Sequence, residues 1–391
     1  MLIKGGCVHN GRGYVGVCDI RIENGLIQEM GEMLQERPAE EIVCAQGMEI
    51  LPGFIQGLSN WGINGSMTEI RPSSNDNAEL SSPVYPELDV VYAFNGRAMT
   101  TQQLGAFGVT AVGVAPEDSN LFGGQMAVFA VDGVNPMKMC LKEKVGLKAS
   151  VTSEVKTVYG SRKTAPMTKM WLFEALGAQF RKAAQYDKEK QDEKTDKKPS
   201  FDPKMEVLCK VLKKELPLFI SCDHKADIYR VRDVLKSYDI RMTICNGNGL
   251  DGSETDLIDE NTSLIARWPM DLMKTDQIPV CARGIARLAD QGMLIALGGI
   301  NGNMSPRAEC LWAAYEMLKV MKDPEKVLPM ITYNPAKILG VDQMTGSLEP
   351  GKRADLVIWS KHPLKSWQAQ VLLTLQSGKV IYKKGDVMRC M

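Results

Sequence analysis

The side chains best suited to proton transfer in this 391-residue sequence are Asp223 and His224, which follow an apolar stretch from Pro217 to Cys222. The stretch is typical of a buried strand, so the pair is expected where that strand ends. A carboxylate beside an imidazole can act in general acid–base catalysis. If the strand continues, however, alternation points His224 away from the side on which Asp223 lies. We therefore favour a structural acid and a surface histidine, and keep catalysis by Asp223 and His224 as the alternative.

A second strand end combines an apolar side chain with a polar one. The run that begins at Ile50 is apolar through Ile55 and then passes into Ser, Asn and Gly. Alternation places Leu58 and Asn60 on the same face of this strand. Leucine has no ligand atom, and an asparagine carbonyl is a poor zinc ligand.

A glycine-rich segment offers a possible anion site. Gly298, Gly299 and Gly302 precede an expected helix start, with Ser305 as the N-cap and Pro306 at the first helical position. Free backbone N–H groups before a helix favour a carboxylate- or phosphate-bearing molecule. The simpler interpretation, which we favour, is a glycine-rich turn between a strand and a helix.

Strands and helices alternate between these candidate sites, which predicts an α/β barrel. Before residue 50 the sequence predicts short strands instead, with a hairpin turn at Asn24-Gly25. In the barrel region we expect strands at 109–114, 126–131, 218–222, 241–245 and 293–297, and helices at 164–186, 205–214, 226–237, 279–291 and 305–321.

Composition excludes several classes of partner. The net charge is zero, so nothing favours a nucleic acid or an anionic membrane, and no apolar run approaches the roughly 20 residues of a transmembrane helix. The ten cysteines include no Cys-x-x-Cys pair, which is typical of reduced thiols and a cytoplasmic location. Three histidines are few for a metal site built from imidazoles.

Motifs spread over essentially the whole chain resemble those of the amidohydrolase superfamily, and of its imidazolonepropionase- and dihydroorotase-like barrels in particular. The motif-bearing segments are 52–62, 77–88, 158–168, 332–340, 345–359 and 377–382. The resemblance implies a (β/α)8 TIM-like barrel over residues 51–344. It also implies a small β-sandwich domain formed by both chain ends, residues 1–50 and 345–391.

The resemblance also implies where a metal would bind. Members of the family hold zinc or another divalent metal through two His on strand 1, one His each on strands 5 and 6, and an Asp on strand 8, and the metal ionises a bound water. Every one of these positions is substituted here: they carry Leu58, Asn60, Ser221, Asn246, and Ile300 or Asn301. We therefore expect no metal and no other cofactor.

The remaining metal-binding residue types do not replace this site. Cys222 and Cys245 end neighbouring strands, and alternation is expected to turn both toward the helix layer. His9 and His362 fall in the β-sandwich segments and are expected to be non-catalytic.

By resemblance the chain is a hydrolase acting on non-peptide C–N bonds, but its residues predict a protein that is inactive as a metallohydrolase. We expect a small-molecule-binding or partner subunit, either a homo-oligomer or in complex with an active paralogue. The alternative is an active hydrolase of a cyclic amide or related compound with a divergent or metal-free site.

Overall fold

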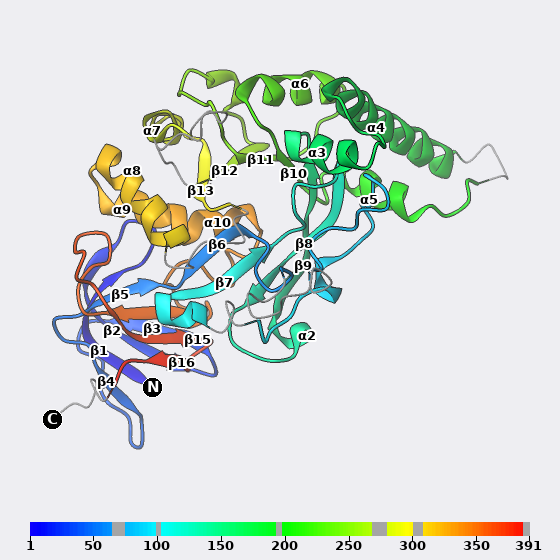
Figure 1. The fold of residues 1–391 in the computed structure, drawn as a ribbon. Coiled ribbons are helices and arrows are strands. Elements are labelled where there is room, and N and C mark those ends of the chain that lie inside the picture. The colour runs from blue at the N-terminus through cyan, green and yellow to red at the C-terminus, as the bar shows by residue number, and fades with distance from the viewer. Residues whose placement is uncertain (65–74, 99–102, 193–197, 268–279, 300–307, 386–391) are drawn as a thin grey trace.

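The structure is a computed structural model that describes residues 1–64, 75–98, 103–192, 198–267, 280–299 and 308–385. Two eight-stranded sheets organise the chain, one in its middle and one formed by its two ends. In Figure 1 the first strands (blue) and the last described strands (red) of the chain lie together in the second sheet. Among the described residues, no helix combines the length and the apolar character needed to cross a bilayer.

The middle of the chain forms a nearly closed barrel, as predicted. A side chain at Gly57 on the first strand would contact Ala296 on the last one, at 3.8 Å, so the two ends of the sheet lie side by side. In spatial order the strands are β6 (Phe54–Ser59), β7 (Val109–Val114), β8 (Phe122–Ala130), β9 (Cys140–Ser150), β10 (Leu218–Ser221), β11 (Met242–Asn246), β12 (Thr262–Ala266) and β13 (Leu294–Leu297).

One barrel strand departs from regular β/α alternation. β8 runs antiparallel to both β7 and β9, whereas the other neighbouring strands of the barrel are parallel. The connection 115–121 between β7 and β8 is too short for the crossover that a parallel pair requires. The chain therefore turns back on itself here instead of adding a helix.

Both chain ends contribute to the second sheet. Its strands are β16 (Lys379–Lys383), β15 (Val371–Gln376), β14 (Leu356–Trp359), β5 (Glu49–Pro52), β1 (Leu2–His9), β2 (Val15–Glu23) and β3 (Leu26–Gly31) in spatial order, with β4 (Ile42–Cys44) paired to β1. The two ends meet where β14 pairs with β5. Apolar residues from several strands, including Ile3, Ile20 and Leu373, form a core separate from that of the barrel. The composite domain is thus present, while its boundaries at 50 and 345 stay a prediction.

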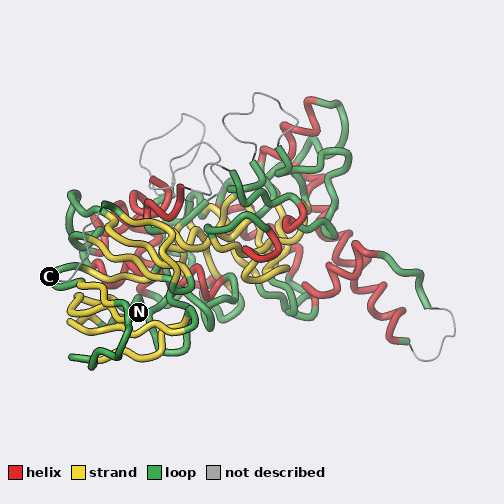
Figure 2. The backbone as a smooth tube through the Cα atoms, turned by 90° about the horizontal axis from the view of Figure 1, so that it is seen from below, coloured by secondary structure: helices red, strands yellow, loops and turns green. Residues whose placement is uncertain are grey.

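The helices cover the barrel and extend beyond it. Helix α4 begins after Thr168, whose hydroxyl accepts a hydrogen bond from the Trp171 N–H. Its apolar side buries Leu172, Leu176 and Phe180, and its C-terminal end extends away from the sheets in Figure 2. The helices are α2 (Pro136–Met139), α3 (Ser153–Ser161), α4 (Lys169–Gln191), α5 (Pro203–Leu212), α6 (Lys225–Leu235), α7 (Ala282–Asp290), α8 (Ala313–Met321), α9 (Pro324–Val327) and α10 (Tyr333–Ile338).

Candidate functional site

A polar cavity of about 460 Å³ opens where the barrel strands β10 and β11 end. The carboxyl ends of parallel barrel strands, and the loops that follow them, are where such folds place their sites. The lining residues include Glu117, Glu154, Lys169, Asp223, His224 and Asn246. We call this cavity the barrel mouth.

Asp223 and His224 both line the barrel mouth, and this corrects the expected position of His224. Strand β10 ends at Ser221, so alternation no longer applies at His224, which instead precedes helix α6 as its N-cap residue. His224 is half-buried, and its Nδ1 has no hydrogen-bond partner among the described residues. It is therefore a cavity histidine rather than a surface one.

Asp223 has the structural contacts that the sequence interpretation favoured. Its Oδ2 accepts a hydrogen bond of 2.7 Å from the Ser153 N–H at the start of α3. The same oxygen lies 3.8 Å from Lys169 Nζ. Asp223 thus joins the loop after β9 to the loop after β10.

Ser221 lies beside a buried lysine that the sequence analysis missed. Lys148 on β9 is only 1% exposed, and its Nζ donates to Ser221 Oγ at 3.0 Å. The ammonium also pairs with the carboxylate of Asp118. The available signal was a lone lysine within the otherwise apolar run 145–149, a pattern that indicates a strand with one buried charge.

The candidate positions Leu58, on β6, and Asn60, just after it, lie in different environments. Leu58 is fully buried in the barrel interior with Ile55 and Phe219, so it offers only apolar contact. Asn60 donates through Nδ2 to Glu117 Oε1 at 3.2 Å, while its buried Oδ1 has no partner among the described residues. Burial, together with the nearby charge of Asp118, raises the pKa of Glu117.

The end of β11 corrects the expected orientation of one cysteine. Asn246 has a φ of 81° and lines the barrel mouth. Cys245 packs in the barrel interior with Phe219, not against the helices, because it is the register partner of the inward-facing Ser221. Burial raises the pKa of Cys245 to about 12, so its sulfur stays a thiol at neutral pH.

Cys222 lies where it was expected. It belongs to the core cluster on the helix side of the sheet, with residues of α6 such as Ile228 and Val231. Burial also raises the pKa of the Cys222 thiol well above its ordinary value.

The candidate anion site is only partly described. Gly298 and Gly299 follow β13 and are buried. The other candidates of this segment, Ile300, Asn301, Gly302 and Ser305, lie outside the described residues.

The donors at the barrel mouth do not fit a catalytic divalent metal. Within the described parts of the chain, no group of three His, Cys, Asp or Glu side chains lies close enough there to share an ion; the two such groups both involve His9. The Lys148 ammonium moreover occupies the barrel interior beside Ser221. This ammonium would repel a divalent cation placed beside it, and the Asp118 carboxylate paired with Lys148 offsets part of that repulsion.

Sequence comparisons connect parts of the chain to amidohydrolases. Residues 272–382 match the model of the amidohydrolase family. The imidazolonepropionase of Thermoplasma acidophilum is 26% identical over 142 residues, which are 35% of this chain and 34% of that protein. The imidazolonepropionase of Bacillus cytotoxicus is 30% identical over 112 residues, 27% of this chain and 26% of that protein. The matched region thus spans about a third or less of these curated relatives.

Structural comparison extends the similarity to nearly the entire chain. An amidohydrolase from Thermotoga maritima matches with a TM-score of 0.90 and 27% identity, over 98% of this chain and 100% of that one. A D-hydantoinase (dihydropyrimidinase) from Thermus sp., with a TM-score of 0.58 and 11% identity over 98% of this chain and 95% of that one, shares the fold. The barrel, the composite sheet and these matches together show that the chain belongs to the amidohydrolase superfamily.

Proposed function

We propose that this amidohydrolase-family protein binds a small polar molecule in the barrel mouth without a catalytic metal and is inactive as a metallohydrolase. The main support is the buried Lys148 ammonium, which pairs with Asp118 and donates to Ser221. A lysine in this environment supplies a fixed positive charge that competes with a divalent cation. Leu58, at a position where the family uses a metal ligand, is fully buried among apolar side chains.

The charges around the barrel mouth indicate the kind of ligand. Carboxylates of Glu154 and Asp223 line it together with the ammonium groups of Lys156 and Lys169. Both signs of charge within one cavity of about 460 Å³ favour a small molecule that carries an amino group and a carboxylate. We therefore infer a zwitterionic ligand of amino-acid size.

Calorimetry with chelator-treated protein tests this proposal. Free amino acids and small dicarboxylates are titrated into the wild type, Lys169→Met and Lys236→Met, the last a control at the exposed residue that follows α6. We expect at least one amino acid to bind the wild type and the control equally, and Lys169→Met about tenfold more weakly, since one charge-assisted contact is lost. No heat from any compound, or binding that appears only after zinc is added, would contradict the proposal.

Metal-free hydrolysis in the same cavity is a second candidate, favoured by His224, which lines the barrel mouth and whose buried Nδ1 has no hydrogen-bond partner among the described residues. A half-buried imidazole facing a polar cavity can act as a general base. Hydantoin and imidazolone propionate, chosen from the names of the similar proteins, are suitable first substrates. We expect any turnover by chelator-treated protein to fall about a hundredfold in His224→Gln. Absence of turnover, or turnover unchanged in that variant, would exclude this candidate.

Assembly stays a prediction as well. Homo-oligomerisation and pairing with an active paralogue differ in one measurable respect, the composition of the purified complex. Light scattering combined with mass spectrometry of protein purified from its native cell distinguishes a single chain type from two.

A further inference from the structure

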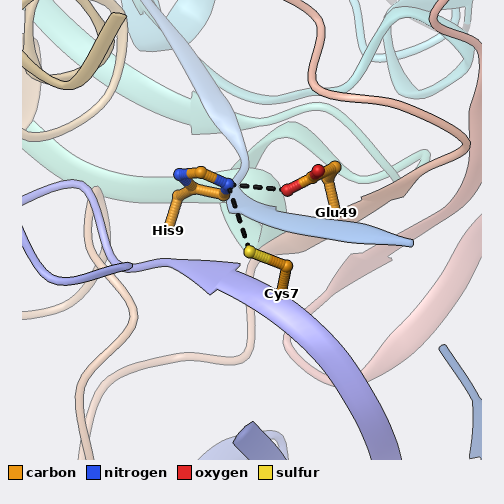
Figure 3. Close-up of side chains that lie close together, drawn as sticks. All are labelled: Cys7, His9 and Glu49. Atoms are coloured by element: carbon orange, nitrogen blue, oxygen red, sulfur yellow. Dashed lines mark hydrogen bonds and ion pairs between the residues drawn. The ribbon is translucent and has the colours of Figure 1, made fainter. Parts of the chain in front are cut away.

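Three side chains of different chemistry converge on the second sheet, far from the barrel mouth in the fold. Cys7 and His9 are two residues apart on β1, so they share a face of the strand. Glu49 on β5 is the register partner of Cys7. Figure 3 shows the thiol and the carboxylate directed toward the same nitrogen of His9. His9 Nε2 lies 2.7 Å from Glu49 Oε2 and 3.7 Å from Cys7 Sγ.

We propose that Cys7 Sγ, His9 Nε2 and a Glu49 carboxylate oxygen form a zinc-binding site on this sheet. A sulfur, an imidazole nitrogen and a carboxylate oxygen are the three donor types that zinc takes in proteins. All three atoms lie within 4.8 Å of one another, so small side-chain rotations would bring them around one ion. Cys7 and Glu49 are only partly buried, which leaves a path for the ion and room for water as a fourth ligand.

The second nitrogen of His9 is already held as a zinc-ligating histidine requires. His9 Nδ1 lies 2.8 Å from Glu325 Oε1 on helix α9. With zinc on Nε2, Nδ1 carries the proton and donates it to Glu325, the carboxylate–histidine–metal arrangement that fixes the imidazole. The site would thereby connect the N-terminal strand to a helix that lies more than 300 positions later in the sequence.

The neighbouring histidine does not form a competing site. The Leu364 N–H donates to His362 Nδ1 at 3.1 Å, so a neutral His362 carries its proton on Nε2. That nitrogen then has no lone pair for a metal. His362 instead packs edge-on against His9, with ring centroids 4.5 Å apart.

When no zinc is bound, His9 Nε2 can carry a proton instead. Burial opposes a charge on His9, but its hydrogen bonds to Glu325 and Glu49 outweigh this and raise the pKa of His9. Zinc binding must displace this proton and the proton of the Cys7 thiol. We therefore expect uptake of zinc to release up to about two protons and to weaken as the pH falls.

Cobalt substitution in the full-length protein tests the site. Chelator-treated wild type is titrated with Co²⁺ and followed by the near-ultraviolet absorption of the thiolate-to-cobalt charge transfer, and zinc is then counted by elemental analysis. The control is Cys44→Ser, because Cys44 is a partly buried thiol on β4 of the same sheet. We expect one equivalent of metal and the absorption band in the wild type and in the control. In Cys7→Ser we expect the band to vanish.

A second variant separates ligation from folding. Glu49→Gln keeps the shape of the side chain and is expected to weaken zinc binding at least about tenfold with unchanged circular dichroism. Absence of the band in the wild type, or its persistence in Cys7→Ser, would overturn the proposal. So would equal zinc affinity in Glu49→Gln and the wild type.

Discussion

A charged side chain in a barrel interior requires partners, and Lys148 has three: the carboxylate of Asp118, the hydroxyl of Ser221 and the carbonyl oxygen of Ala149. Removal of one member of a buried ion pair leaves the other without compensation. The pair thus has a measurable effect on stability as well as on the chemistry of the barrel mouth.

The first prediction concerns this pair. Lys148→Met is expected to lower the free energy of unfolding by about 3 kcal/mol at neutral pH, because Asp118 loses its counter-charge. In the double variant Lys148→Met/Asp118→Asn most of this loss should be recovered. Urea unfolding of the wild type, both single variants and the double variant measures the coupling; strictly additive effects would contradict a direct interaction.

Glu309 provides a second prediction, on pH. Gln56 Nε2, on β6, donates a hydrogen bond of 3.1 Å to the Glu309 carboxyl group. Burial raises the pKa of Glu309 to about 9. The pKa of Glu309 is higher in the folded protein than in the unfolded chain, so protonation of this carboxyl favours the folded state. The protonated carboxyl contributes fully to stability below about pH 4.5, and this contribution is lost as the pH rises toward 9.

The uncharged isostere Glu309→Gln should therefore flatten the pH dependence of stability. At pH 7 the cost of keeping Glu309 protonated is roughly 3 kcal/mol, so the variant is expected to be more stable than the wild type there and similar at pH 4.5. Thermal unfolding across this pH range is the measurement. If the pH profile of Glu309→Gln ran parallel to that of the wild type, Glu309 would ionise as readily in the folded protein as in the unfolded chain, and the prediction would be wrong.

At the residue scale the sequence indicated the ends of strands better than the directions of the side chains that follow them. Ser221 is the last residue of β10 and Asn60 directly follows β6, so both lie at strand ends as expected, while their part in a site stays a prediction. His224 was misplaced because the last residue of β10 cannot be identified from composition, and one residue decides whether alternation still applies. Cys245 was misplaced because its orientation depends on the register with β10, which is a tertiary property.

At the scale of elements, close approach of two backbones determines where β6 and β7 can pair. A Cβ atom on Gly113 of β7 would lie 2.6 Å from the Gly57 carbonyl oxygen on β6. The Gly57 carbonyl oxygen is a backbone atom, so it cannot rotate away from this contact as a side-chain atom could. Gly160 in α3 differs, since its Cβ would meet only Met167 Cγ, at 3.9 Å.

These two glycines give a matched prediction. Gly113→Ala should destabilise the fold by about 2 kcal/mol, because the strand pair must move apart. Gly160→Ala should be neutral or stabilising by up to about 1 kcal/mol, since alanine restricts the unfolded chain and favours the helix. Chemical denaturation of both variants is the test, and equal effects at the two positions would contradict the packing of β6 against β7.

The reversed strand β8 shows what periodicity misses. The sequence predicted a strand at 126–131, whereas the strand begins at Phe122 and so leaves only a short connection after β7. Strand direction follows from connection length. An error of a few residues in one boundary therefore hid the reversal.

At the scale of the whole molecule, motif order predicted the architecture well. Segments near both chain ends resembled halves of one domain, and β14 does pair with β5 across some 300 residues of intervening barrel. Side-chain clusters between distant segments were not predictable in this way. The contacts of His9 with Glu49 and Glu325 require the folded sheet to bring β1, β5 and α9 together.

The most direct test of a barrel mouth without a catalytic metal is a crystal structure grown with zinc and measured at the zinc absorption edge. We predict no anomalous peak among the carboxyl ends of β6, β10, β11 and β13; a peak at Cys7 and His9 would belong to the separate site on the second sheet. A peak about 2.0–2.3 Å from donor atoms at the ends of those four strands, the usual range of zinc–ligand bonds, would contradict it.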